Sequence, residues 1–525
     1  MEKSRIPTAG EAPMGVYVRL SIDPEGIVPA AWKDFYRQAR DFLTGHPDGL
    51  VGLRREPVKG TTRLVYSRQL EHEPQDPAQR HLRVSGDLAS MTHGESFCLY
   101  EDLGHYRTRQ PSTVPRDLLR AVLKGDQGVT VFSEKTQGHP YHLAVLGVAI
   151  LAEGRFPDCA LVSGDINRDQ CLDALRTLEE QCGIRAPIPL LVDADRLYAA
   201  LIGATPCLES MDRYVCAGTN PEEHIRVLQR HVARETLLDW LAAQVGQHEG
   251  RVTLGVLRRF RQWLNAIGDL DGLIDAVCCR PVGPQLAPEP LASALVATGI
   301  TLDPDRLAGL DRLDRPATTP DSVYSQLGNA MLDIMGASAR NCRYRLGVAA
   351  VVARLHERFP AHGDACRETI ERETATLVQK LRDLGAQVAH LSEDAEGEEE
   401  SGDGESFVRH QSGAQLSPAQ TLILDEFGAA LRPLWDDWQS GLGGRFGTDV
   451  EARHGRLMHV AESQMLALTE SGWAWIDAEQ DAQMFDLMLL LLSQDDRAEL
   501  FTNLRRGLFE YRDLCDYLRM RVVGR

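Results

Sequence analysis

The chain has 525 residues, 43% of them hydrophobic and 25% charged, which is the usage of a globular protein of about three domains. Its net charge is −19 at pH 7, and its bases are 51 arginines and only six lysines. The acidic balance argues against non-specific nucleic-acid binding, because phosphate contacts require a basic surface. The arginine bias is typical of a GC-rich bacterial genome.

Cysteine usage and hydropathy point to the cytoplasm. The eleven cysteines are scattered, with no Cys-x-x-Cys pair and no zinc-type spacing. The longest strongly apolar run, Leu487–Leu492, is far shorter than the ~20 residues that span a bilayer. We therefore expect a cytoplasmic protein without a membrane partner.

The first region, 1–110, is predicted to be a small α+β domain. Gly15–Ile22 alternates like a strand, and Pro29–Leu43 places apolar residues at helical spacing. Further strands are expected at Thr62–Ser67, His81–Val84 and Ser96–Tyr100.

The second region, 111–215, alternates predicted helices and strands, which favours a mostly parallel sheet of βαβ type. The helices are expected at Val114–Leu123, Tyr141–Ala152, Arg168–Gln181 and Ala194–Leu201, and the strands at Val129–Ser133, Cys159–Val162 and Ile188–Val192.

The rest of the chain is predicted to be mostly α-helical, as a domain over 216–391 and a C-terminal domain over 414–525. Between them, residues 392–413 are expected to form a disordered loop. Eight acids and no base fall within 392–405, in a Gly/Ser-rich context. Pro433 is expected to end a helix that begins near Pro418.

The main catalytic candidates follow the strands of the second region. The acids Glu134, Asp165 and Asp193 each come after a predicted strand, and His139 and His142 lie in the loop after the first. Carboxyl ends of parallel strands share one sheet edge, so these groups could bind a divalent metal or perform acid–base chemistry. The alternative interpretation is that Asp165 and Asp193 cap helices.

Part of this region resembles the proteolytic domain of the Lon-type proteases. The resemblance rests on Val129–Glu134, Gly138–Leu146 and Ala160–Ile166 as strand, helix-opening loop and Gly-acid-Ile turn. It implies a related topology and no catalytic site. Tyr141 stands where that family has its nucleophilic serine. The family also needs a lysine further along the chain, and the only lysine after Lys135 is Lys380 in the helical region.

Three further clusters are candidates for chemistry or binding. The segment Thr92–Ser96 combines hydroxyl, imidazole and carboxylate groups. Arginines alternate with aromatic residues in two helical segments, as in single-strand nucleic-acid platforms. Large aromatic residues of the C-terminal region could anchor a partner. The residues of the last two groups are Arg258, Arg259, Arg261, Arg340, Arg343, Arg345, Trp435 and Trp438.

The sequence favours a non-enzymatic interaction protein, such as an adaptor or regulatory subunit of a bacterial multi-protein system, because no strong catalytic motif is present. It predicts other proteins as partners and no cofactor. One alternative is a metal-assisted hydrolase at the strand ends of 111–215, which would use a divalent metal. A second alternative is a single-stranded RNA- or DNA-binding protein. Oligomeric state and partner identity do not follow from the sequence.

Overall fold

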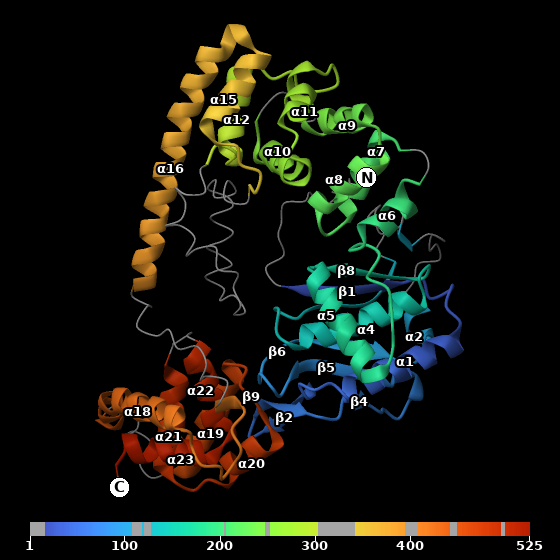
Figure 1. The fold of residues 1–525 in the computed structure, drawn as a ribbon. Coiled ribbons are helices and arrows are strands. Elements are labelled where there is room, and N and C mark those ends of the chain that lie inside the picture. Colours follow the sequence, from blue (N-terminus) through green and yellow to red (C-terminus); the bar gives the residue numbers. More distant parts are fainter. Residues whose placement is uncertain are drawn as a thin grey trace, which may run out of the picture. The chain divides into compact units, whose positions relative to one another are not determined.

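The computed structural model describes residues 16–107, 118–119, 128–203, 206–246, 252–302, 342–393, 407–440, 449–494 and 499–524, without the side chains of 381–393 and 499–500. The fold class agrees with the sequence prediction. Strands in two sheets fill the N-terminal half, and the rest is mostly helical (Figure 1). Within the described residues, no helix is long and apolar enough to cross a membrane.

Two compact units make up the chain. Unit 1 comprises 1–165, 169–187 and 398–525, and unit 2 comprises 166–168 and 188–397. The structure thus joins the C-terminal helices to the N-terminal sheets, whereas the sequence interpretation placed boundaries at 110, 215, 391 and 413. A domain boundary near 110 would separate paired strands, because the strand Tyr17–Ile22 of the first region pairs with two strands of the second.

The N-terminal part of unit 1 contains most of the strands. Its elements are β1 (Tyr17–Ile22), α1 (Pro29–Thr44), β2 (Leu50–Val58), β3 (Thr61–Ser67), β4 (Glu71–His72), β5 (His81–Asp87), β6 (His93–Tyr100), α2 (Gly104–Arg107), β7 (Val129–Lys135), α4 (Tyr141–Arg155), β8 (Ala160–Gly164) and α5 (Arg168–Cys182).

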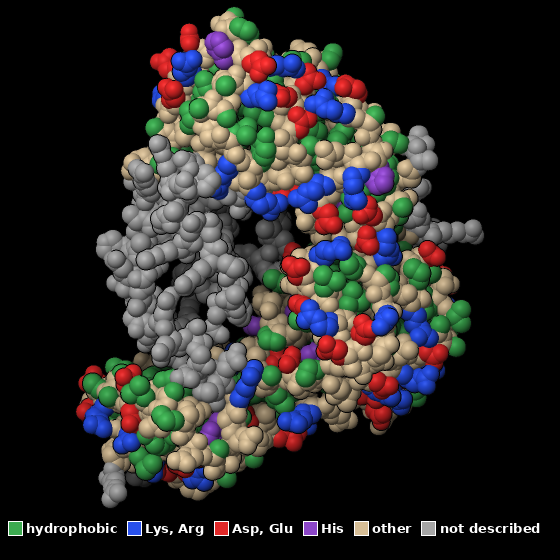
Figure 2. Space-filling view, in the orientation of Figure 1, with side chains coloured by type: hydrophobic (Ala, Val, Ile, Leu, Met, Phe, Trp, Pro, Cys, Tyr) green, Lys and Arg blue, Asp and Glu red, His purple; other side chains and the backbone are tan. Residues whose placement is uncertain are grey.

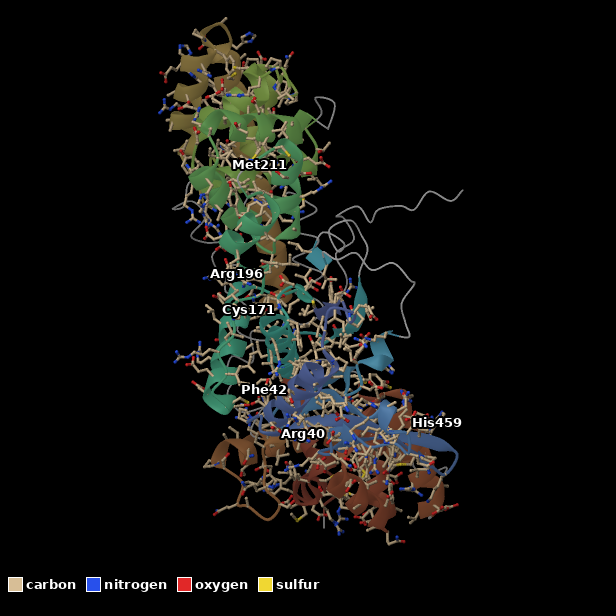
Figure 3. The ribbon with its side chains drawn as sticks, turned by 90° about the vertical axis from the view of Figure 1, so that its right-hand side faces the viewer. Arg40, Phe42, Cys171, Arg196, Met211 and His459 are labelled. Carbon is tan, nitrogen blue, oxygen red and sulfur yellow. The ribbon has the colours of Figure 1, made fainter. Side chains whose placement is uncertain are left out.

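The first sheet has the order β7-β1-β8, and β1 runs antiparallel to both neighbours. The expectation of a mostly parallel sheet is wrong, because β1 inserts between the two strands that α4 connects. Helix α4 is apolar on nearly all sides and packs between this sheet and α1. Gly147 allows that approach, since a Cβ there would lie 2.8 Å from the Phe42 ring, which Figure 3 labels on α1.

The second sheet has the order β4-β5-β2-β3-β9, with β6 paired to β5. It is mixed, as expected for the first region, but its last strand comes from the C-terminal region. That strand, β9 (Ala467–Thr469), runs parallel to β3 with Leu64 opposite Ala467.

The C-terminal helices of unit 1 surround a second apolar core. They are α18 (Pro418–Trp438), α19 (Val450–Ser463), α20 (Glu470–Ala478), α21 (Ala482–Ser493), α22 (Glu499–Glu510) and α23 (Arg512–Val522). Pro433 lies inside α18 and does not end it. Its exposed ring faces away from the core, while Leu431 and Trp435 on either side are buried.

The predicted disordered loop is ordered at its C-terminal end. Phe407 and Val408 are buried in the core, and Asp513 accepts hydrogen bonds from His410 and from the backbone of Gly413. These apolar and charge-assisted contacts outweigh the polar composition that suggested disorder over 407–413. The acidic residues 394–406 lie outside the described residues.

Unit 2 is helical. Its helices are α6 (Ala194–Leu201), α7 (Leu208–Ala217), α8 (Pro221–His231), α9 (Arg234–Gly246), α10 (Leu254–Ile267), α11 (Leu270–Ile274), α12 (Pro288–Thr298), α15 (Gly347–Arg358) and α16 (Gly363–Glu393). The expected strand at Ile188–Val192 is wrong, because these residues form turns and irregular structure.

Candidate functional site: a polar junction in unit 1

The two candidate histidines of the β7–α4 loop have different roles. The ring of His142 is buried, and its Nδ1 lies 2.7 Å from the Thr136 hydroxyl. That hydroxyl donates to the carbonyl of Val16, so it accepts from Nδ1–H of His142. His139 is only half-buried. His142 is therefore a structural residue that fixes the start of α4.

The three strand-end acids have separate surroundings and separate bonding partners. Glu134 and Gly164 both lie opposite Val18, on the two sides of β1. The Asp165 carboxylate accepts from the backbone N–H of Tyr17 at 3.3 Å. Asp193 belongs to unit 2, where it caps α6 by accepting from Arg196 N–H.

The capping interpretation therefore describes Asp193, while Asp165 bonds the backbone of a neighbouring strand. Across the described part of the chain, no group of three or more His, Cys, Asp or Glu residues is arranged to hold a metal ion.

The structure instead brings together two segments that the sequence offered as separate candidates. Strand β6 begins beside the end of β7, and the Glu95 carboxylate accepts from Lys135 N–H at 2.8 Å. The Tyr141 hydroxyl donates to the Glu95 carbonyl. A Cβ at Gly94 would lie 2.5 Å from that hydroxyl, so glycine is needed for this approach. The segment Thr92–Ser96 and the β7–α4 loop thus form one site.

His93 is oriented by a tyrosine that the sequence analysis did not single out. The Tyr66 hydroxyl donates to the carbonyl of Met91 at 2.9 Å and lies 3.0 Å from Nδ1 of His93. Because the hydroxyl proton is used for Met91, the ring of His93 donates through Nδ1–H. Its Nε2 is then the proton-free nitrogen of the neutral imidazole.

Residues from the C-terminal region complete this site. Val408 packs with Tyr66 and Met91 in one small core, and a Cβ at Gly507 of α22 would lie 2.7 Å from the Phe407 carbonyl. Arg506, whose charge acts on both histidines, precedes Gly507 on this helix. We call the turn 87–93, the loop 135–142, the segment 407–410 and α22 together the polar junction.

Electrostatics at the polar junction disfavours protonated histidine. Burial, the positive charge of Arg506 and the neighbouring His139 lower the pKa of His93 from 6.5 to about 4. Burial and Arg506 also lower the pKa of His139. Burial and Glu95 raise the pKa of the Glu134 carboxyl. Both imidazoles are thus neutral at pH 7, and each can accept a proton if a negative charge approaches.

A surface hollow of about 340 Å³ lies between α1 and α4. Its arginines are already paired with carboxylates of the same hollow: Arg40 with Asp41 at 3.0 Å, and Arg155 with Asp34 at 3.6 Å. Figure 3 labels Arg40 there. Such exposed, self-compensated pairs are typical of an ordinary surface.

In unit 2, the two arginine-rich segments meet. Asn265 of α10 accepts from the backbone N–H of Arg343 at 2.7 Å and of Tyr344 at 3.3 Å. Arg258 and Arg261 precede Asn265 on the same face of α10, at helical spacing. Arg345 donates to the carbonyl of Cys342. Arg340 lies outside the described residues.

Two of the aromatic residues of these segments are core residues, whereas Tyr344 is only half-buried. Phe260 and Trp263 are fully buried, and the Trp263 ring nitrogen donates to the Asp269 carbonyl. Arg259 turns toward the core, with its guanidinium 6.0 Å from the centre of the Trp240 ring. In the C-terminal region, Trp435 is buried in the core and Trp438 packs against it.

The pH dependence of stability can be predicted at His142. Burial lowers the pKa of this imidazole from 6.5 to about 4, so the folded state disfavours the protonated form. The unfolded chain takes up the proton first, and stability falls as the pH drops from 6.5 towards 4. We expect a loss of about 2 kcal/mol by about pH 5 from this residue. Urea unfolding should show a flatter pH profile for His142→Gln than for the native chain, and equal profiles would contradict the assignment.

Comparison with known proteins adds no relative: no family model, no curated protein and no solved structure matches the chain.

Proposed function

We propose that this protein is a non-enzymatic interaction protein, an adaptor or regulatory subunit of a bacterial multi-protein system, which binds an acidic protein partner through unit 2. The observation that carries the proposal is the meeting of two arginine-rich segments, about 80 residues apart in sequence, at Asn265. We call Arg258, Arg261, Arg343 and Arg345 the arginine patch.

Charge supports this assignment. On a chain with a net charge of −19, a local group of guanidiniums is a positive surface in a negative surround. Figure 2 shows Lys and Arg side chains gathered near α8 and α10. Arg258 is exposed, and the Arg343 side chain is 68% exposed although it pairs with Glu222. Guanidinium groups bind carboxylates in bidentate geometry, which suits an acidic partner.

A protein partner is favoured over single-stranded nucleic acid for a specific reason. Affinity for single strands comes largely from stacking bases on exposed aromatic rings. Phe260 and Trp263 are instead core residues. Glu222 also lies within the patch, where it accepts from Asn265 and pairs with Arg343.

The test is a pull-down from the native host, carried out in parallel with untreated and with nuclease-treated extract. The native chain and the control Arg367→Glu, an exposed arginine of α16, are expected to retain the same acidic protein. The double variant Arg258→Glu/Arg261→Glu should retain at least tenfold less of it. Recovery of the bait alone would contradict the adaptor proposal. Retention that depends on RNA would favour the nucleic-acid alternative, and equal retention by the patch variant would exclude this surface.

A further inference from the structure

Two histidines lie opposite each other at the β4 end of the second sheet of unit 1. His72 of β4 and His81 of β5 are direct partners in the antiparallel pairing of these strands, so both side chains are on the same face of the sheet. Their ring centres lie 4.8 Å apart, and the ring planes are inclined by 47°. Two imidazoles that share one metal ion at about 2.1 Å have ring centres roughly 5 Å apart, which is close to the spacing of this pair.

The ring of His81 is held in the tautomer that binds a metal. Its Nδ1 lies 2.9 Å from the carbonyl oxygen of Gln79, so Nδ1 carries the proton and donates it. The short helix η1 (Pro77–Gln79) positions that carbonyl. Nε2 is then the proton-free nitrogen. Metal-binding histidines typically have this arrangement, in which a backbone carbonyl or a carboxylate fixes the ring from the side opposite the ion.

Packing makes His81 the rigid member of the pair. It is 6% exposed, and the ring of Tyr100, its partner on β6, lies 4.9 Å away on the other side. His72 is exposed. A fixed ligand beside an adjustable one requires little rearrangement to bind an ion. Burial lowers the pKa of His81 against the opposing bond to Gln79, so its imidazole is neutral at pH 7.

Arg83 competes for the proton-free nitrogen. Its Nη2 lies 3.5 Å from Nε2 of His81, at the limit of a hydrogen bond, and the side chain is exposed. A guanidinium only donates, so this contact agrees with a proton-free Nε2. The contact also places Nε2 beside an exposed side chain, from where an ion reaches the nitrogen once the guanidinium turns into water.

The neighbouring carboxylates have other partners, which decides the class of ion. Glu71 accepts from the Tyr36 hydroxyl at 3.0 Å, and Glu101 pairs with Arg80 at 3.5 Å. Mg²⁺ and Ca²⁺ require such oxygen ligands. Imidazole nitrogens without a carboxylate suit zinc, nickel and copper instead.

We propose that His72 and His81 form a binding site for a divalent transition-metal ion of the zinc, nickel and copper class. The described residues contain no group of three or more protein ligands, so water completes the coordination. The ion joins β4, an edge strand of two residues, to β5 and closes the polar segment 73–80 between the two histidines. The site belongs to unit 1 and is independent of the arginine patch in unit 2.

Titration with Zn²⁺, followed by the imidazole NMR signals, tests the site directly. The signals of His72 and His81 should shift together and saturate. The exposed His459 on α19 of the same unit, labelled in Figure 3, should not shift in the same concentration range. Mg²⁺ should leave all three signals unchanged. With Cu²⁺, electron paramagnetic resonance should show two nitrogen ligands on the bound ion.

Variants separate the pair from weak binding at single histidines. Even a hydrogen-bond partner of a metal ligand typically contributes about tenfold or more in affinity, so His72→Gln or His81→Gln should weaken Zn²⁺ binding at least as much. Arg83→Gln should strengthen it, because a competitor for Nε2 is removed. The matched control His459→Gln should bind like the native chain.

Far-ultraviolet circular dichroism checks the folding of each variant, and the exposed position of His72 makes His72→Gln the safest of them. Equal Zn²⁺ binding by a folded His72→Gln variant would overturn the proposal. So would unchanged His72 and His81 signals at millimolar Zn²⁺, or shifts of the same size at His459.

Discussion

Replacing Arg453 by Met is expected to lower the free energy of unfolding of unit 1 by about 3–5 kcal/mol, as when one partner of a buried ion pair is removed. Arg453 on α19 and Asp486 on α21 are 4% and 2% exposed, and they form two parallel bonds of 2.8 and 3.0 Å. Loss of the guanidinium leaves the Asp486 carboxylate desolvated, with only a weak contact from Gln439 at 3.4 Å. Urea unfolding followed by circular dichroism measures this loss.

The double variant Arg453→Met/Asp486→Leu distinguishes the cost of an unpaired charge from the value of the pair. Apolar replacement of both partners removes the desolvation problem, so we expect the double variant to recover at least half of the stability lost in Arg453→Met. The exposed Arg456 of the same helix supplies the control, because Arg456→Met should change stability by less than about 0.5 kcal/mol. A double variant less stable than Arg453→Met would contradict the view that the unpaired Asp486 carboxylate causes the loss.

The second large effect is expected at Trp473. This side chain is buried, its ring nitrogen donates to the Leu64 carbonyl at 2.7 Å, and Arg63 lies over its ring. Trp473→Ala should cost about 3–5 kcal/mol, from lost apolar burial and a lost buried hydrogen bond. Because the contact joins α20 to β3, limited proteolysis should release fragments from the C-terminal region sooner than in the native chain.

Trp473→Phe isolates the hydrogen bond. It retains most of the apolar contact and leaves the Leu64 carbonyl without this donor, so we expect a loss of about 1–3 kcal/mol. The half-buried Trp475, whose ring nitrogen donates to the Phe509 carbonyl, is the comparison within α20. Its contact lies among the C-terminal helices, so Trp475→Phe should not change the rate of proteolysis between the sheets and the C-terminal region. Equal proteolysis of the native chain and Trp473→Ala would contradict the docking role.

Local patterns predicted most elements of this chain because they depend on neighbouring residues. The apolar face of α1, with Trp32, Phe35 and Phe42 buried, follows from helical spacing, and β7, α4 and β8 lie close to their expected positions. Pairing between distant segments was not accessible in this way. Nothing in Ala467–Thr469 indicates that these three residues extend a sheet formed some 400 residues earlier.

At the polar junction too, local sequence patterns marked some residues, while the contacts between distant segments could not be predicted. His93 and His139 were noticed in separate segments because of their residue types, but their proximity depends on the pairing of β5 with β6 and on the start of α4. Tyr66 and Arg506 lie in an ordinary strand and an ordinary helix, and no local signal marks them. The strand expected before Asp193 was wrong for the opposite reason. Leu190–Val192 are apolar and look like a strand, although they form a turn that leads to the helix cap expected for Asp193.

The parallel pairing of β3 with β9 sets an order for the folding of this chain on the ribosome. Unit 1 needs residues from both ends of the sequence, and its second sheet stays incomplete until Ala467–Thr469 have been synthesised. Unit 2 is almost entirely one continuous segment, so its contacts can form while the last 128 residues are still being translated. The edge of β3 that later pairs with β9 remains unpaired during that interval. Because an unpaired strand edge can pair with another chain, the growing chain must be kept from aggregating at this edge until β9 has been made.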